Sequence, residues 1–214
     1  MTEEIRITME NLQKNGMQPF YVKTKEEVVP LIKTLVEKGS SVSHGGSETL
    51  KQTGIVELLK NGDYDYIDRS GLEGEELRQS YIRAFGCDTY FSSSNAVTMN
   101  GELYNVDGNS NRVACIVYGP RQVIIVVGKN KIVNNINDAV LRVKQCAAPP
   151  NTQRLECKTP CAVTGHCISL DKENPFICDG CTSPQRICCN FVISAKQRHT
   201  YRIKVIIVDE TLGY

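Results

Sequence analysis

The sequence contains no apolar run long enough to cross a membrane. Its longest such run, residues 123–127 (VIIVV), has the length of a strand, whereas a transmembrane helix needs about 18 to 20 apolar residues. The N-terminus also lacks the features of a signal peptide, because Glu3 and Glu4 stand where positive charge would be and no apolar segment follows. We therefore expect a cytoplasmic protein with no membrane partner.

The chain also lacks an excess of either charge. Its 25 basic and 24 acidic residues give a net charge of +1, so nothing general in its electrostatics favours nucleic acid as a partner. There is no repeat with the period of a solenoid and no low-complexity tract. The 214 residues are expected to form one α/β domain, with residues 151–190 as a cysteine-rich insertion.

Histidine is scarce. The three histidines, His44, His166 and His199, are scattered along the chain and suggest no serine–histidine–acid arrangement. The sequence therefore assigns no catalytic residue.

Helical and strand patterns alternate over residues 1–150. Apolar residues recur at helical spacing over residues 28–36, and residues 123–127 form the continuous β-branched run of a strand covered on both faces. Residues 201–208 (YRIKVIIV) return to strand character after the cysteines and are expected to rejoin the main sheet. The pattern predicts an α/β fold, an open and mostly parallel sheet with helices on both faces.

Two local predictions concern the second half of this region. Residues 103–106 and 113–118 flank Asp107 and Gly108, so they are expected to form a hairpin. A helix is expected after residues 128–131, and the two prolines in residues 147–150 (AAPP) are expected to end it.

Cysteine is abundant in one place only. Such a cluster is either a disulfide framework or a thiolate metal site, and in a reducing cytoplasm the metal site is favoured. Cys87 and Cys115 lie apart in apolar contexts, as expected of small core residues. The other eight are Cys146, Cys157, Cys161, Cys167, Cys178, Cys181, Cys188 and Cys189.

The spacing of these cysteines favours an iron–sulfur cluster. Only Cys178 and Cys181 form the C-x2-C unit that zinc knuckles carry in pairs, and the bacterial ferredoxin run is absent. Zinc remains the alternative, and thiols without metal are a third interpretation. His166 could replace one thiolate, although a lone loop histidine is more often solvated.

A second set of residues points to a ligand. The loop of residues 43–49 (SHGGSET) follows a strand and opens a helix, so it could hold an anion or be a glycine turn with a serine cap. Lysines after the strand of residues 123–127 lie where ligands gather in α/β sheets, although surface lysines are usually only solvated. The candidate ligand-binding residues for a small anionic metabolite are Gly45, Gly46, Ser47, Asn95, Thr98, Arg112, Asn130 and Lys131.

Several stretches resemble the LUD-domain, or lactate-utilization, family. Residues 85–133 are similar to the core of the family and end in GKNKIV, residues 45–50 (GGSETL) fit its first half, and residues 158–190 with SPQRIC resemble the cysteine-rich end of its stand-alone bacterial branch. The resemblance implies a fold related to the sugar-phosphate isomerase and CoA-transferase superfamily. It also implies a role in oxidising L-lactate to pyruvate, a [4Fe–4S] cluster and iron–sulfur redox partner proteins.

The chain departs from that family in two places. Relatives have four cysteines spaced five, two and six residues apart; Cys161, Cys181 and Cys188 match, while either Cys167 or Cys178 could be the second ligand. Cys157 and Cys189 are extra. Relatives also carry an acidic residue at the position of Met99, so acyl-transfer chemistry is not expected unless Glu102 substitutes.

Two functions of different classes follow. The first is a redox-associated LUD-domain protein with a [4Fe–4S] cluster that supports lactate oxidation. The second is an enzyme or sensor for a carboxylate or phosphate ester, with a structural zinc ion. A scaffold whose cysteine segment docks another subunit is a third interpretation.

Overall fold

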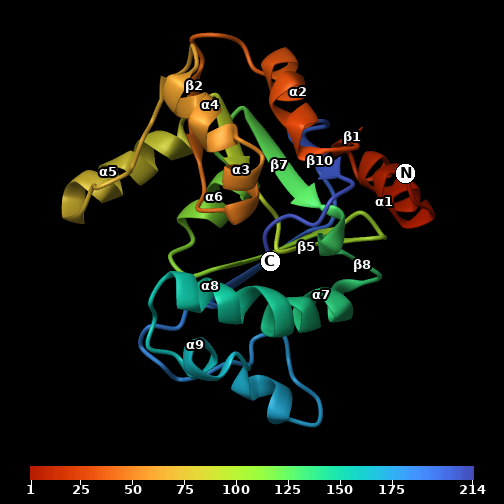
Figure 1. The fold of residues 1–214 in the computed structure, drawn as a ribbon, viewed down its shortest axis with the longest axis vertical. Coiled ribbons are helices and arrows are strands. Elements are labelled where there is room, and N and C mark those ends of the chain that lie inside the picture. The colour runs from red at the N-terminus through yellow and green to blue at the C-terminus, as the bar shows by residue number, and fades with distance from the viewer.

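The computed structural model describes residues 1–214 and places the main sheet at the centre of the fold (Figure 1). All of its paired strands are parallel, and the segment after the cysteines supplies β10, which lies between β1 and β7. The predicted return of the chain to the main sheet is therefore confirmed. The strands, in sheet order, are β1 (Gln18–Val22), β10 (Ile203–Val208), β7 (Gln122–Gly128), β4 (Thr89–Ser92), β2 (Ser41–His44) and β3 (Asp65–Tyr66).

Helices cover both faces of this sheet because its central strands are apolar on both sides. In β7, Val123 and Ile125 face one core cluster, while Ile124 and Val126 face the other, and all four are fully buried. The first cluster includes residues of α1 (Glu3–Lys14), α5 (Gly74–Phe85) and α6 (Asn111–Val117). The second includes residues of α2 (Val28–Leu35), α3 (Glu48–Gln52) and α4 (Ile55–Asn61), and the short 3-10 helix η1 (Lys25–Glu27) precedes α2. The predicted α/β class is confirmed.

A second, four-stranded sheet lies beside the first and was not predicted. Its order is β8 (Ile132–Val133), β5 (Ala96–Thr98), β6 (Leu103–Asp107) and β9 (Asn190–Ser194), with β5 parallel to β8 and β6 antiparallel to both β5 and β9. A third core cluster joins this sheet to α7 (Ile136–Arg142). The chain after the cysteines is thus tied to both sheets, through β9 and β10.

The predicted hairpin is wrong. Its first strand exists as β6, but its second half is the helix α6. Asp107 Oδ2 accepts hydrogen bonds from the backbone nitrogens of Arg112 and Val113, both at 3.1 Å, and so caps the helix start. Val113 and Ile116, three residues apart, are then buried. Capping and tertiary packing outweigh the β propensity of this short segment.

The prolines do not end the helix that contains α7. A π-helical turn, η3 (Val143–Ala147), joins α7 to α8 (Ala148–Arg154), and Pro149 and Pro150 lie in the first turn of α8. Proline is tolerated there because the first N–H groups of a helix need no acceptor within it. Ile132, expected in the helix, belongs to β8, after the 3-10 helix η2 (Lys129–Lys131).

The cysteine-rich segment has little regular structure, as predicted. It contains α9 (Pro160–Thr164) and the 3-10 helix η4 (Ile168–Asp171), and it lies below α7 and α8 in Figure 1. None of the helices is both long enough and apolar enough to span a bilayer.

Candidate functional site

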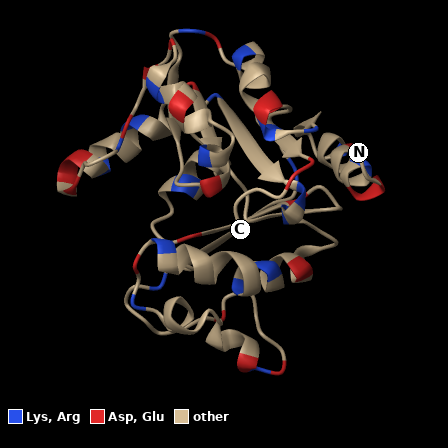
Figure 2. Cartoon of the chain, viewed as in Figure 1, with Lys and Arg blue, Asp and Glu red and all other residues tan.

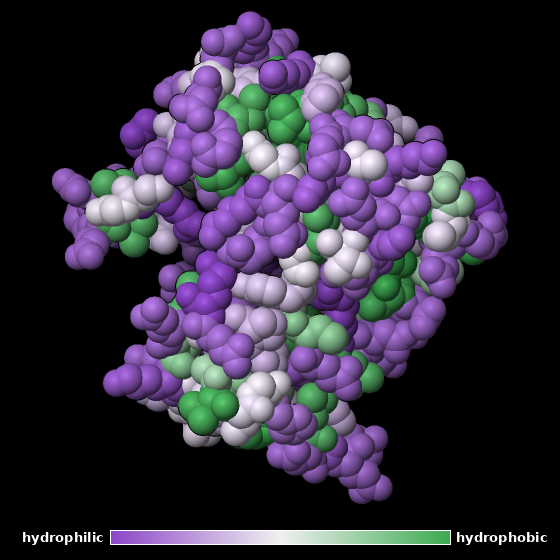
Figure 3. Space-filling view, in the orientation of Figure 1, coloured by the Kyte–Doolittle hydropathy of each residue, from purple (hydrophilic) through white to green (hydrophobic).

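A cavity of about 740 Å³ lies at the carboxyl ends of the central strands, where ligands collect in open α/β sheets. It is bounded by the start of α3, the loop after β4, α6, η2, α8 and the chain around Cys188. In Figure 3 the outline of the molecule is hollowed between α5 and the lower part of the fold, where the side chains are mainly hydrophilic. The cavity is therefore a polar one, formed by segments distant in sequence.

Most of the predicted ligand-binding residues meet at this cavity. Gly46, Ser47, Asn95, Arg112 and Lys131 all line it. The Ser47 hydroxyl accepts a hydrogen bond from the Leu50 nitrogen at 3.3 Å, so it also caps α3 as the sequence suggested.

The remaining three predicted residues do not line the cavity. Gly45 lies behind it, where a Cβ atom would come within 2.9 Å of Arg112 Cδ. Thr98 donates to Glu102 Oε2 at 2.6 Å within a turn. Asn130 Oδ1 accepts from the Leu212 nitrogen at 3.1 Å and holds the C-terminal segment. Gly45 thus makes room for a cavity residue, while Thr98 and Asn130 have structural contacts only.

Lys131 is the most unusual residue of the cavity. It is 4% exposed and has no carboxylate partner; its Nζ donates to Thr49 Oγ1 at 2.9 Å and to Ser93 Oγ at 3.0 Å. Burial, followed by the nearby cations Arg142 and Arg112, lowers the pKa of Lys131 to about 7. This lysine therefore exists in comparable amounts as ammonium and amine near neutral pH.

The Arg112 guanidinium donates hydrogen bonds to neutral acceptors. Its two terminal nitrogens donate to Asn105 Oδ1 at 2.7 Å, Asn95 Oδ1 at 3.1 Å and the backbone oxygens of Ser93 and Val106. Burial lowers the pKa of Arg112. Arg112 thus fixes Asn95, and its positive charge forms no ion pair with a carboxylate.

Arg69 was not foreseen. Its guanidinium lies over the ring of Tyr81, 5.8 Å from the centroid, with no hydrogen-bond acceptor or acidic partner, and both residues line the cavity. Figure 2 shows basic residues on α6 and at the end of α8, the two helices on either side of the cavity. Five basic side chains and three carboxylates line it in total, so its potential favours an anion.

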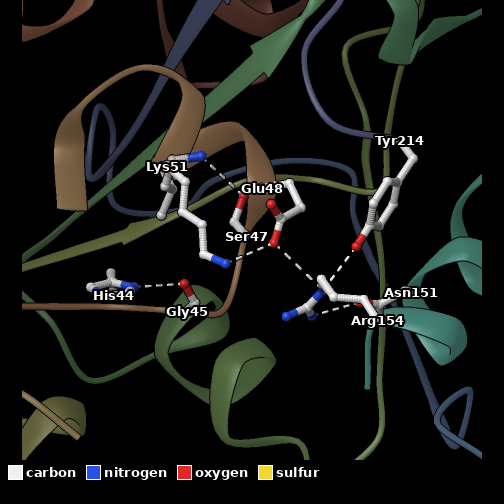
Figure 4. A network of polar contacts seen from close by, with 9 residues as sticks. His44, Gly45, Ser47, Glu48, Lys51, Asn151, Arg154 and Tyr214 are labelled. Atoms are coloured by element: carbon white, nitrogen blue, oxygen red, sulfur yellow. Dashed lines mark hydrogen bonds and ion pairs between the residues drawn. The ribbon is translucent and has the colours of Figure 1, made fainter. Parts of the chain in front are cut away.

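A polar network closes one edge of the cavity (Figure 4). Glu48 contacts Lys51 at 3.0 Å and Arg154 at 3.6 Å, and Arg154 Nε donates to Tyr214 Oη at 2.8 Å. This network links α3, α8 and the C-terminal segment. Sequence reasoning missed these residues, because no local pattern connects positions 48, 154 and 214. Thr49 and Ser93, by contrast, follow β2 and β4 and could have been found from their place after strands.

A second, smaller cavity brings four cysteines together. It is lined by Cys161, Cys167, Cys181 and Cys188, while Cys178 is exposed and does not line it. All ten cysteines are free thiols, so no disulfide links the segment. The arrangement places Cys167 rather than Cys178 beside the other three.

The other cysteines lie in three different settings. Cys87 and Cys115 belong to the main core, where burial raises the pKa of Cys87 to about 12 and that of Cys115 to about 11. Cys157 and Cys189 line the larger cavity, and Cys146 is exposed. The two core cysteines are therefore weak nucleophiles, as expected of packing residues.

Polar groups support the sulfurs of the smaller cavity. The hydroxyls of Thr159 and Thr152 lie 3.4 Å and 3.5 Å from Cys161 Sγ. Arg186 Nε donates to Cys188 Sγ at 3.2 Å. Burial raises the pKa of Cys188 even though Arg186 acts in the opposite direction. Hydrogen bonds of this kind stabilise thiolates and tune the metals they hold.

A buried lysine supports a third sulfur indirectly. Lys144, in the π-helical turn, is 5% exposed and donates to Ser169 Oγ at 2.9 Å and to the backbone oxygen of Asp179. Ser169 Oγ in turn lies 3.2 Å from Cys167 Sγ. Lysine, serine and cysteine form one buried chain of contacts, and π-helical turns frequently occur at functional sites.

No three histidine, cysteine or acidic side chains converge closely enough to hold a single metal ion. The four thiols line one common cavity. The two cavities also share a wall, because Arg186, Ile187 and Cys188 line both of them. A group bound by the thiols would therefore be adjacent to a ligand in the larger cavity.

Comparison with known proteins agrees with this architecture. A solved structure of a DUF162 family protein from Deinococcus radiodurans matches with a TM-score of 0.51, 14% identity and coverage of 96% of each chain, which supports the fold. The structure of eIF2B delta from Chaetomium thermophilum is similar over 51% of this chain and 48% of its own, with 15% identity and a TM-score of 0.33. No curated protein matches. The family model described as LUD domain matches residues 5–208, and the chain therefore belongs to the LUD-domain family.

Proposed function

We propose that this LUD-domain protein binds a small anionic metabolite in the larger cavity and a [4Fe–4S] cluster at Cys161, Cys167, Cys181 and Cys188. In this role it supports the oxidation of L-lactate to pyruvate, or a related redox step. The observation that carries the proposal is the shared wall: Arg186 and Cys188 line both cavities. An electron would thus have only a short distance to cross between metabolite and cluster.

Four thiolates are a donor set for either a zinc ion or a [4Fe–4S] cluster, and we propose the cluster. A single zinc ion holds each sulfur at about 2.3 Å, which brings sulfurs within about 3.8 Å of one another. A [4Fe–4S] cluster binds each thiolate to a different iron and keeps the sulfurs farther apart. Four thiols around one space, with no compact single-ion group, agree with the second arrangement. When bound, such a cluster supplies one-electron transfer.

The residues around the thiols would stabilise the thiolates. The hydroxyls of Thr159 and Thr152 and the Arg186 guanidinium would stabilise the charge on Cys161 and Cys188. Lys144 would do the same for Cys167 through Ser169. These contacts also hold the cysteine-rich segment in place, because that segment has little regular secondary structure.

The larger cavity would bind the carboxylate of lactate or pyruvate. Of its three carboxylates, Glu48 is paired with basic residues, Asp107 caps α6 and Glu156 is in no ion pair, so none of them pairs with Lys131 or Arg69. A metabolite anion would supply the missing negative charge. We extend the proposal to a cytoplasmic location, to an iron–sulfur partner protein that exchanges electrons with the cluster, and to one LUD-like domain with residues 151–190 as its metal-binding insertion.

Metal analysis of anaerobically purified protein tests this proposal. We expect iron and sulfide in the ratio of a [4Fe–4S] cluster and a broad absorption band that bleaches on reduction. The variant Cys167→Ser should lose the cluster, and the matched variant Cys178→Ser should keep it. A colourless protein with one equivalent of zinc and no iron would reject the electron-transfer function.

Such a zinc result would favour the second candidate, an enzyme or sensor for a carboxylate or phosphate ester. The size of the cavity, about 740 Å³, supports it, because lactate alone would fill only a small part of that volume. Under this function, Lys131→Met should weaken binding of sugar phosphates or acyl-CoA without changing the metal content. Unaltered binding of lactate, sugar phosphates and acyl-CoA would contradict it.

A further inference from the structure

We propose that Lys131 is a nucleophilic amine that forms a reversible imine with a 2-oxo acid bound in the larger cavity. The inference rests on the proposed anion-binding function of that cavity and adds covalent chemistry to it. It is based on the contacts of the Lys131 nitrogen, on an unpaired guanidinium in the same cavity and on the close covering of the lysine by the C-terminal segment.

The contacts of Lys131 Nζ leave one direction free. A tetrahedral nitrogen has four directions, of which one is its bond to carbon and two are taken by hydrogen bonds to Thr49 Oγ1 and Ser93 Oγ. Each hydroxyl directs its own hydrogen toward a backbone oxygen, that of Leu212 and of Ser94 respectively, both at 3.4 Å. Both hydroxyls are thus acceptors for the lysine. In the neutral amine the remaining direction holds the lone pair, which is the nucleophile.

The surroundings favour that neutral form. Lys131 is 4% exposed, lies near two arginines and has no carboxylate to stabilise its ammonium. These factors lower its pKa to about 7. Lysines that form imines are activated in this way, by desolvation and by neighbouring cations.

A 2-oxo acid also needs a group that binds its carboxylate. Arg69 lines the same cavity, and its guanidinium has no hydrogen-bond acceptor in the protein. Its planar fork matches a carboxylate in two-point contact. Arg112 cannot take this role as readily, because four neutral acceptors already occupy its terminal nitrogens. In this proposal Arg69 binds the carboxylate and Lys131 attacks the adjacent carbonyl.

The C-terminal segment covers the lysine closely. A Cβ atom on Gly213 would lie 2.6 Å from Thr49 Oγ1 and 3.3 Å from Lys131 Nζ, and Gly213 has φ of +59°. Only glycine combines this conformation with so close an approach. The Gly213 nitrogen also donates to Gln52 Oε1 at 2.7 Å, which holds the segment over α3. With this covering, Lys131 is only 4% exposed.

The proposed step is balanced without any further reagent. The lone pair of Nζ attacks the carbonyl carbon, and a carbon–nitrogen bond forms. Both hydrogens of the amine leave with the carbonyl oxygen as one water molecule, and the carbon–nitrogen double bond replaces the carbon–oxygen double bond. No electron is gained or lost by the substrate, and hydrolysis reverses the step.

Reductive trapping tests this proposal. The purified protein is incubated with pyruvate, treated with borohydride and digested, and its peptides are examined by mass spectrometry. We expect one reduced pyruvyl group on Lys131 in the wild-type protein and none in Lys131→Arg, which keeps a cation but lacks a nucleophilic amine. The control variant Lys129→Met removes an exposed neighbour that is paired with Asp209 and should leave the labelling unchanged.

Calorimetry on the same samples distinguishes the imine at Lys131 from the anion-binding function of the larger cavity. Saturable pyruvate binding with no label on Lys131, or with equal label on Lys129 and other exposed lysines, would overturn the imine and leave the anion-binding function intact. An absence of pyruvate binding to the wild-type protein would overturn both. Arg69→Gln should reduce trapping by at least tenfold at low pyruvate concentration, because it removes the contact with the carboxylate.

Discussion

Arg186 Nε lies 3.2 Å from Cys188 Sγ, and both residues belong to the wall that the two cavities share. The guanidinium also reaches the backbone oxygens of Cys181 and Cys178, at 3.3 Å and 2.8 Å. One arginine therefore holds three cysteine positions in place and puts a positive charge beside the proposed cluster.

Replacement of this arginine should lower the reduction potential of the cluster. Reduction adds negative charge, which the guanidinium stabilises, so Arg186→Gln should shift the potential downward by about 60 mV, equivalent to about 1.4 kcal/mol for one electron. A redox titration followed by absorbance measures this shift. The control Lys172→Met removes an exposed lysine of the same segment and should leave the potential unchanged. Equal potentials in Arg186→Gln and wild type would remove Arg186 from this role.

The contact chain from Lys144 to Cys167 should stabilise the cysteine segment. Ser169→Ala removes the hydroxyl between them and leaves a donor of the buried lysine without a partner, which costs about 1–3 kcal/mol. We expect faster loss of iron to a chelator and a lower denaturation midpoint. Ser169→Thr keeps the hydroxyl and should restore part of the iron retention and part of the denaturation midpoint. If alanine and threonine behaved alike, the hydroxyl would have no such function.

The stability of the protein should depend on pH through Lys131. Its pKa is about 7 in the folded state and about 10.5 when unfolded, so between these values the unfolded chain binds more protons and stability rises with pH. Below about pH 7 the lysine is charged in both states and its full penalty is present, with an upper bound of about 5 kcal/mol. Lys131→Met should therefore exceed wild type in stability most at pH 6, with a difference that shrinks toward pH 10. Urea denaturation across this range measures the effect; a difference independent of pH would contradict it.

Gly45 should be required for the position of Arg112. In Gly45→Ala the new Cβ would approach Arg112 Cδ at 2.9 Å and Tyr90 Oη at 3.2 Å, and such overpacking costs about 1–3 kcal/mol. We expect weaker pyruvate binding together with a lower denaturation midpoint. At Gly86 the nearest atom is the Arg83 backbone oxygen at 3.7 Å, so Gly86→Ala is a control with ordinary contacts. Unchanged binding in Gly45→Ala would show that Arg112 can shift without consequence.

Part of the site could be predicted because it follows strands. Ser47, Asn95 and Lys131 come shortly after β2, β4 and β7, and parallel strands bring their carboxyl ends to one edge of the sheet. Arg69 follows β3 in the same way but was not singled out. Arg154 and Tyr214 follow no strand closely and reach the cavity only through the packing of α8 and the C-terminal segment, which depends on contacts between distant parts of the chain.

The sequence alone determined the α/β class, the strand identity of residues 123–127 and the supply of thiols, because periodicity, β-branching and composition are local properties. It left Cys167 and Cys178 as alternatives, and it wrongly favoured a strand over residues 113–118. The tertiary structure brings Cys167 beside Cys161, Cys181 and Cys188, and it makes residues 111–117 a helix that Asp107 caps. The physical reason is that loop packing and capping depend on neighbours in space, whereas the alternation of helix and strand patterns is a property of the local sequence.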